Sequence, residues 1–195
     1  MKFSSREIAL AGLMAGIMVV VTVITRIPFV YAAVPFSMQP LIAILAGLLL
    51  GARAGALSVI VYIILGLIGL PVFATEPFGG PAYILKPTFG FLLGQAAAAY
   101  VAGAIMGKCQ EIRKHHYILA SLVGMGVLYL VGLPYLFGIL NFYLGSATTV
   151  GKVLQIGFLP FFLWDIVKAV VVALLAMAIH RRLPDYSPAG KGPSL

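Results

Sequence analysis

Charged residues are scarce in this sequence, and acidic residues are the scarcest of them. The chain has five aspartates and glutamates and 13 lysines and arginines, and charged residues make up only 9% of its 195 positions. Hydrophobic residues account for 62%, and the mean hydropathy is +1.10. A soluble globular domain carries roughly 25% charged residues, so this composition excludes that class and indicates an integral membrane protein.

Residues and motifs that support catalysis or metal binding are also few. The single cysteine, Cys109, excludes an intrachain disulfide, and with three scattered histidines it forms no convincing metal-ligand cluster. The sequence lacks a G-x-x-x-x-G-K-[ST] phosphate loop, a G-x-S-x-G elbow and an H-E-x-x-H metal motif. We therefore predict a protein that is not an enzyme, holds no cofactor and does not use ATP through a phosphate loop of its own.

The net charge of +8 does not predict nucleic-acid binding. The basic residues fall at the ends of apolar runs, and no aromatic residues are interleaved with them to stack on bases. We interpret these residues as topology signals and as contacts with anionic membrane lipid.

Long apolar runs are abundant. A helix needs about 20 apolar residues to cross the hydrocarbon core, so the chain accommodates roughly six spans and no second soluble domain. We predict one all-α domain over residues 1–195, a compact bundle of six transmembrane helices with irregular loops on the outer side. The predicted spans are residues 7–25, 37–51, 54–69, 88–106, 117–140 and 159–180.

The distribution of basic residues predicts the orientation of this bundle. Six spans place both termini on one side, where nine lysines and arginines fall, against Arg26, Lys86 and Lys152 on the other side. Because lysine and arginine concentrate in cytoplasmic loops, we predict a multi-pass protein of the cell membrane with both termini cytoplasmic. Residues 26–40, 71–91 and 141–158 then face outward.

The last predicted span carries an acid and a base, Asp165 and Lys168, on one helical face. A charge at the centre of a membrane helix costs about 2.5 to 3.5 kcal/mol, so such residues usually face a bundle interior or a cavity. Either the two side chains form an ion pair for packing alone, or they bind a polar ligand. We favour the ligand. Asp165 lies about 9 Å into the helix, beneath the outer loops.

Two outer segments are unusually apolar and irregular. Residues 26–40 contain three prolines, and Gln39 adds an amide donor and acceptor there. Residues 71–91 contain four prolines, three glycines and five aromatic residues, which is typical of a wall or lid over a small ligand. Lys86 in this segment pairs with Glu76, lies in solvent or contacts the ligand. The further residues predicted to line the pocket are Phe73, Gly79, Gly80, Tyr83 and Trp164.

The first predicted span contains two interleaved pairs of small residues. Ala11 is spaced four residues from Ala15, and Gly12 four residues from Gly16, a pattern that lets another helix approach closely. From the residues alone, packing inside the bundle and contact with another subunit are equally open.

Five segments together resemble the BioY-type proteins, the biotin-specific S components of energy-coupling factor (ECF) transporters. They are residues 34–39, 45–58, 69–74, 86–91 and 157–168. The resemblance implies six helices, an outward-facing biotin site, and assembly with a transmembrane coupling protein and two cytoplasmic ATPases. It also implies that the face of Ala11 and Ala15 docks on the coupling protein.

On this basis we expect high-affinity capture of biotin. Asp165 would accept a hydrogen bond from a ureido N–H group, Lys168 would donate to the ureido oxygen, and aromatic residues of segment 71–91 would pack on the rings. The carboxylate tail would reach Lys86 or lie in solvent. The alternative is a stand-alone, proton-coupled secondary transporter in which Asp165 relays a proton.

Overall fold

The structure, a computed structural model, describes residues 3–27, 37–109 and 113–182. Every regular element in these ranges is helical, which confirms the predicted all-α class. The α-helices are α1 (Ser5–Thr25), α3 (Gln39–Leu67), α4 (Phe89–Lys108), α5 (Lys114–Gly138), α6 (Val150–Gly157) and α7 (Leu159–Arg182). A 3-10 helix, η1 (Pro81–Leu85), precedes α4, and a π-helical turn, η2 (Ile139–Tyr143), extends α5.

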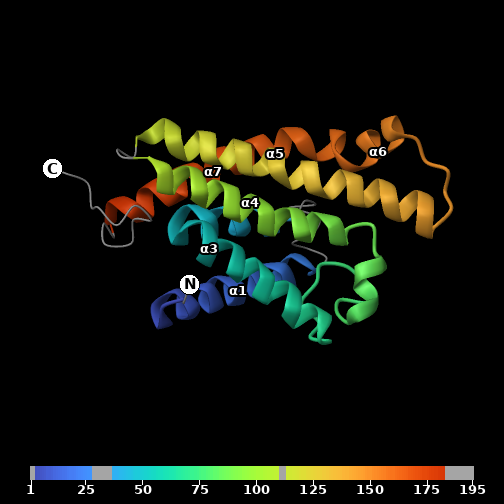
Figure 1. Ribbon diagram of the computed structural model, residues 1–195, viewed down its shortest axis with the longest axis horizontal. Helices are drawn as coiled ribbons and strands as arrows, with labels where there is room; N and C mark the ends of the chain where they lie inside the picture. The colour runs from blue at the N-terminus through green and yellow to red at the C-terminus, as the bar shows by residue number, and fades with distance from the viewer. Residues whose placement is uncertain (1–2, 28–36, 110–112, 183–195) are drawn as a thin grey trace.

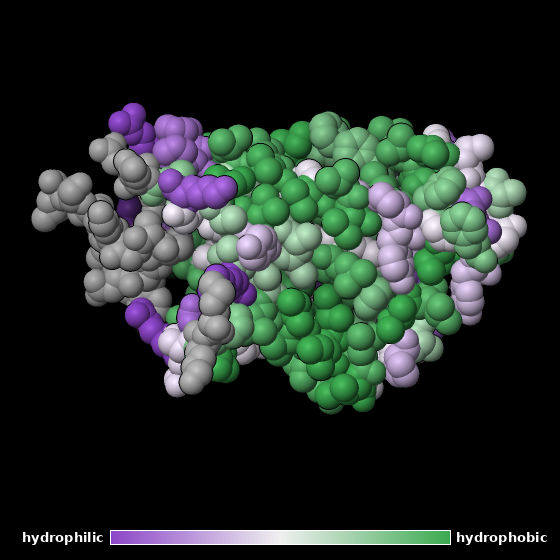
Figure 2. All heavy atoms as spheres, in the orientation of Figure 1, coloured by the Kyte–Doolittle hydropathy of each residue, from purple (hydrophilic) through white to green (hydrophobic). Residues whose placement is uncertain are grey.

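Five helical stretches in the described residues are long and apolar enough to cross a membrane. They are Ser5–Thr25, Gln39–Leu67, Phe89–Lys108, Lys114–Tyr143 and Leu159–Arg182. Apolar side chains cover the middle of the molecule, and strongly hydrophilic residues gather at one end (Figure 2). The protein is therefore a multi-pass membrane protein, although five long stretches stand where the sequence predicts six spans.

The difference in number lies in α3, which contains the predicted spans 37–51 and 54–69 in one helical stretch. Gly51 interrupts this stretch with a φ of 81° and a ψ of 176°, a backbone conformation that glycine adopts readily. A side-chain carbon on Gly55 would overlap the backbone of Gly47, although the two residues would lie about 12 Å apart along a straight helix. The second half of α3 therefore turns at Gly51 and packs against the first half.

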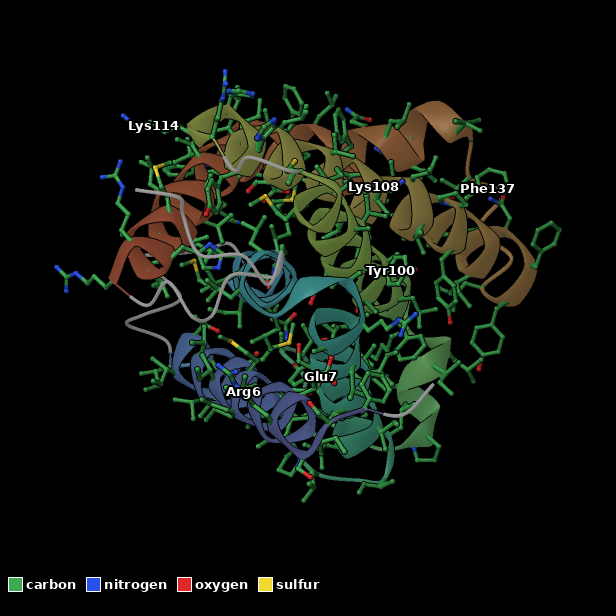
Figure 3. The ribbon with its side chains drawn as sticks, turned by 60° about the vertical axis from the view of Figure 1, so that its left-hand side comes forward. Arg6, Glu7, Tyr100, Lys108, Lys114 and Phe137 are labelled. Carbon is green, nitrogen blue, oxygen red and sulfur yellow. The ribbon has the colours of Figure 1, made fainter. Side chains whose placement is uncertain are left out.

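Small residues also bring the other helices into close contact. Gly47 of α3 packs against the backbone of Ala99 in α4, and Gly94 of α4 packs against the backbone of Leu128 in α5. Glycine and alanine permit such approaches because they present no side chain to hold the backbones apart. The helix α7 contacts both α5 and α3. Figure 3 shows α1, marked by Arg6 and Glu7, at one edge of the bundle, with α3 between it and α4.

The ends of the helices divide the bundle into two poles. The start of α1, the end of α4, the start of α5 and the end of α7 lie at one pole, whereas η1, η2 and α6 lie at the other (Figure 1). The short helix α6 lies in a region that the sequence suggests is a polar connector. Thr149 caps it by accepting a hydrogen bond from the Lys152 amide at 3.3 Å, which satisfies one of the amide groups left open at a helix start.

Candidate functional site

A cavity of about 360 Å³ opens at the pole that carries η1 and α6. This volume lies within the range of small-molecule sites, about 300 to 1,000 Å³. Each surrounding helix contributes residues from its half near this pole. The lining consists of Ser37, Gln39, Pro40, Ala74, Thr75, Tyr83, Thr88, Phe91, Leu92, Gln95, Leu128, Tyr129, Leu136, Ile156, Gly157, Phe161, Asp165 and Lys168.

Asp165 and Lys168 both line this cavity, and both are buried, at 5% and 8% exposure. The Lys168 Nζ atom lies 2.8 Å from Asp165 Oδ1 and donates a second hydrogen bond, at 2.9 Å, to the backbone oxygen of Ser37. The Tyr129 hydroxyl donates to Asp165 Oδ2. The ion pair and the cavity-facing placement are thus both present, and the chain before α3 is tied to α7 through Lys168.

The amide of Gln39, the first residue of α3, also lines the cavity but is engaged within the protein. Its Nε2 atom donates to Thr22 Oγ1 at 3.1 Å and to the Tyr62 hydroxyl at 2.6 Å, and its Oε1 atom accepts from the Ser37 hydroxyl at 3.3 Å. Tyr62 in turn donates to the backbone oxygen of Val72 at 2.8 Å. Gln39 therefore joins α1, α3 and the loop after α3 beneath the cavity.

Aromatic residues of segment 71–91 form one wall in two layers. Tyr83 lines the cavity and its hydroxyl lies 2.9 Å from Thr75 Oγ1. Phe73 stacks behind it, with ring centroids 4.1 Å apart, and contacts Gly66 of α3 on its other side. Phe73 is fully buried and supports the Tyr83 ring from outside the cavity lining.

Four other residues predicted for the site lie outside the lining. Gly79 packs against the backbone oxygen of Leu70, and the Gly80 amide donates to the oxygen of Gly66 at 2.7 Å. These glycines let the loop approach α3. Lys86 is exposed at the end of η1, and Trp164 is 53% exposed on the outside of α7.

The small residues of α1 divide between two faces. Ala11 and Ala15 are buried, each at 1% exposure, in the face that packs on α3. A side-chain carbon added to Gly12 or Gly16 would meet no atom within 4 Å. Within this chain, the alanine pair packs inside the bundle and the glycine pair faces away from it.

The C-terminal end of α1 contacts the loop between α3 and η1. Arg26 donates from Nη2 to the backbone oxygen of Pro71 at 2.7 Å, and its guanidinium lies 4.7 Å from the centre of the Phe78 ring. A cation over an aromatic face is attracted by the negative charge above the ring. This contact and the Gln39 network hold the loop over the cavity from two directions.

Sequence reasoning missed several lining residues, among them Thr75, Thr88, Gln95, Tyr129 and Phe161. Gln95 had a usable signal, because it is a lone polar residue in an apolar, small-residue span. Tyr129 and Phe161 had none, since aromatic residues are frequent throughout the chain and only packing selects those that face the cavity.

Comparisons with known proteins find relatives along most of the chain. The BioY family model matches residues 1–185. A protein of Lysinibacillus sphaericus named a probable biotin transporter BioY is 40% identical over 76% of this chain and 74% of its own. The biotin transporter BioY of Thermotoga maritima is 34% identical over 90% of this chain and 96% of its own.

A solved structure has the same fold. The S component for biotin from an ECF-type ABC transporter superposes with a TM-score of 0.64 and 21% identity, covering 92% of this chain and 95% of that one. The family model spans the chain and the curated relatives are named as transporters, so the prediction that the chain is not an enzyme is confirmed. The full-length match of the family model and the curated relatives show that this chain belongs to the BioY family.

Proposed function

We propose that this protein is the high-affinity biotin-binding S component of an ECF-type importer. The observation that carries the proposal is the buried Asp165–Lys168 pair, which faces a cavity of ligand size at one pole of a membrane bundle. The names of the relatives and of the solved structure support biotin as the ligand.

The chemistry of the pair matches the ureido ring of biotin, which has two N–H donors and one carbonyl acceptor. Asp165 accepts from a ureido N–H, Lys168 donates to the ureido oxygen, and Tyr83 packs beside the ring system. Each hydrogen bond to a charged group contributes about 1.5 to 3 kcal/mol, so two or three, together with burial of the apolar rings, are sufficient for nanomolar affinity. Lys86, which lies in sequence between the lining residues Tyr83 and Thr88, is the proposed partner of the carboxylate tail.

The orientation follows from the charges at the two poles. Among the described residues, Arg6, Arg53, Lys108, Arg113, Lys114, Arg181 and Arg182 belong to the pole opposite the cavity. We infer that this basic pole is cytoplasmic, that both termini lie there, and that the two halves of α3 are separate spans, six in all. The cavity then opens outward.

Uptake in this proposal is driven by partners. A transmembrane coupling protein and two cytoplasmic ATPases supply the energy, and α1 supplies the docking face. In this chain the exposed Gly12 and Gly16, next to the buried Ala11 and Ala15, are the positions where a partner helix can approach most closely.

The test is biotin binding by calorimetry to the purified protein and to the variants Asp165→Asn and Lys168→Met. Each variant removes one charge and keeps much of the side-chain size, so we expect at least a tenfold loss of affinity in both. Lys152→Met, at an exposed position on α6, is the matched control and should bind like the parent. If both site variants bind biotin like the parent, the assignment of Asp165 and Lys168 to the biotin site is wrong.

Uptake measurements in vesicles distinguish the S component from the alternative, a stand-alone transporter. If the purified chain alone accumulates biotin, and collapse of the proton gradient abolishes this, the chain is a proton-coupled transporter. Uptake that requires the coupling protein and ATP supports the S component.

A further inference from the structure

Gln95 is a buried amide in the cavity wall with an unused acceptor. It lies on the second turn of α4, is 3% exposed and lines the cavity. Its Oε1 atom is fully buried and accepts no hydrogen bond from any residue in the described ranges. A buried amide oxygen without a donor destabilises the protein that contains it.

The neighbouring polar groups in the same cavity behave differently. The Gln39 amide has partners on Thr22, Tyr62 and Ser37. The Asp165 carboxylate accepts from both Lys168 and Tyr129. Among the described residues that line the cavity, Gln95 is thus the one with a buried side-chain oxygen that lacks a donor.

The local sequence offers no structural reason for a glutamine at this position. Gly94 and the residues at 96–99 are glycine or alanine, and the polypeptide packs closely here because Gly94 contacts the backbone of Leu128. An apolar side chain of similar length would satisfy the bundle without leaving an acceptor unpaired. A molecule bound in the cavity would supply the missing donor if it placed an N–H or O–H group beside this amide oxygen.

We propose that Gln95 is a specificity-determining residue of this site, and that its Oε1 atom accepts a hydrogen bond from an N–H group of the bound ligand. This inference rests on the proposed function, in which the ligand is biotin. The two ureido N–H groups are then divided between two acceptors, one to Asp165 and one to Gln95. A ligand with a single N–H on this ring leaves one of the two acceptors unpaired and is rejected.

The first test separates binding from folding with the variant Gln95→Met. Thermal unfolding of the ligand-free protein in detergent should be unchanged or shifted upward, because the variant removes an unpaired acceptor. Biotin affinity should fall about 10- to 100-fold, because a ureido N–H then lacks its partner. Gln39→Met is the matched control for stability: it should lower the unfolding temperature, since it breaks three hydrogen bonds within the protein.

The second test identifies the ligand group that Gln95 contacts. We would measure the affinity of the parent and of Gln95→Met for biotin and for its two mono-N-methylated ureido analogues. The analogue methylated at the N–H facing Gln95 should bind the parent weakly and should lose little more in Gln95→Met, because both changes remove the same hydrogen bond. For the other analogue, the loss of affinity caused by methylation and the loss caused by Gln95→Met should add.

The outcomes distinguish this inference from the proposed function. If the parent does not bind biotin, the proposed function fails. If the parent binds and Gln95→Met binds equally well, or if both analogues lose affinity independently of Gln95, the assignment of Gln95 is overturned and the biotin site stands. A Gln95→Met protein that loses both stability and binding also overturns it, because the amide then serves the fold.

Discussion

At the scale of single residues, Asp165 shows how a charge is kept ready inside a membrane bundle. Its two carboxylate oxygens are held by different helices, Oδ1 by Lys168 on its own helix and Oδ2 by Tyr129 on α5. A paired and hydrogen-bonded charge avoids much of the penalty of burial, and its direction is fixed before a ligand arrives.

The variant Tyr129→Phe tests this positioning. We expect biotin affinity to fall about tenfold, because Asp165 loses a donor and its carboxylate can rotate. The ring itself stays in place, since it packs on Phe158 with centroids 4.9 Å apart. Calorimetry measures the loss, and Tyr100→Phe, at a half-exposed position on α4, is the control. Equal affinities for the two variants would contradict the role of the hydroxyl.

The sequence singled out the charged pair because an acid and a base in an apolar helix are conspicuous. Both residues line the cavity, and their role toward a ligand stays a prediction. The sequence also placed Gln39 and Tyr83 at the site, and both line the cavity. Gly79, Gly80 and Phe73 were predicted for the site because segment 71–91 is rich in glycine and aromatic residues. In the structure they pack the loop on α3. Composition marks a segment as unusual, but the side of the loop that meets the cavity depends on tertiary packing.

At the scale of helices, glycines determine how closely the elements approach. A methyl group on Gly47 would overlap the backbone of Ala99, whereas one on Gly12 would meet no atom within 4 Å. The same residue type is therefore structural in α3 and is open to a partner in α1.

Gly47→Ala and Gly12→Ala form a matched pair that tests this difference. We expect Gly47→Ala to destabilise the protein by about 1 to 3 kcal/mol, because α3 and α4 must move apart. Gly12→Ala should match the parent or be slightly more stable, since alanine favours helix. Thermal unfolding in detergent measures both variants, and equal unfolding temperatures would contradict the close packing of α3 on α4.

Helix boundaries show where local sequence is sufficient and where it is not. The predicted span 88–106 differs from α4, Phe89–Lys108, by no more than two residues at either end, because apolar length defines it. The predicted break between 51 and 54 corresponds to the turn at Gly51. The helix α6 was missed because it is short and is held by its cap and by contacts with α5 and α7.

At the scale of the whole molecule, α1 is the long helix that packs mainly on one neighbour, α3. It packs on α3 and leaves a broad apolar face uncovered, which includes Leu13, Ile17 and Val20. The cavity lies among α3, α4, α5, α6 and α7, so no described α1 residue lines it. The outer face of α1, the proposed docking face, can thus be altered without touching the site.

The double variant Gly12→Leu, Gly16→Leu tests this separation. We expect unchanged biotin affinity but loss of copurification with the coupling protein, because leucine side chains prevent close helix approach. Gly126→Leu, at an exposed glycine of α5 with equally open surroundings, is the control and should still assemble. Normal assembly of the double variant would exclude the glycine face as the docking surface.

The turn at Gly51 also determines how deep the site lies in the membrane. The helix from Gln39 to the turn is about 18 Å long, whereas the hydrocarbon core is about 30 Å thick. If Arg53 lies near the membrane surface at the basic pole, as proposed, Gln39 and the cavity floor lie well below the headgroups on the opposite side. Mobile salt ions screen charges in water but act weakly at that depth. Biotin affinity should therefore change less than about twofold between 0.05 and 0.5 M sodium chloride, and a vitamin could be captured equally well from dilute and from saline surroundings.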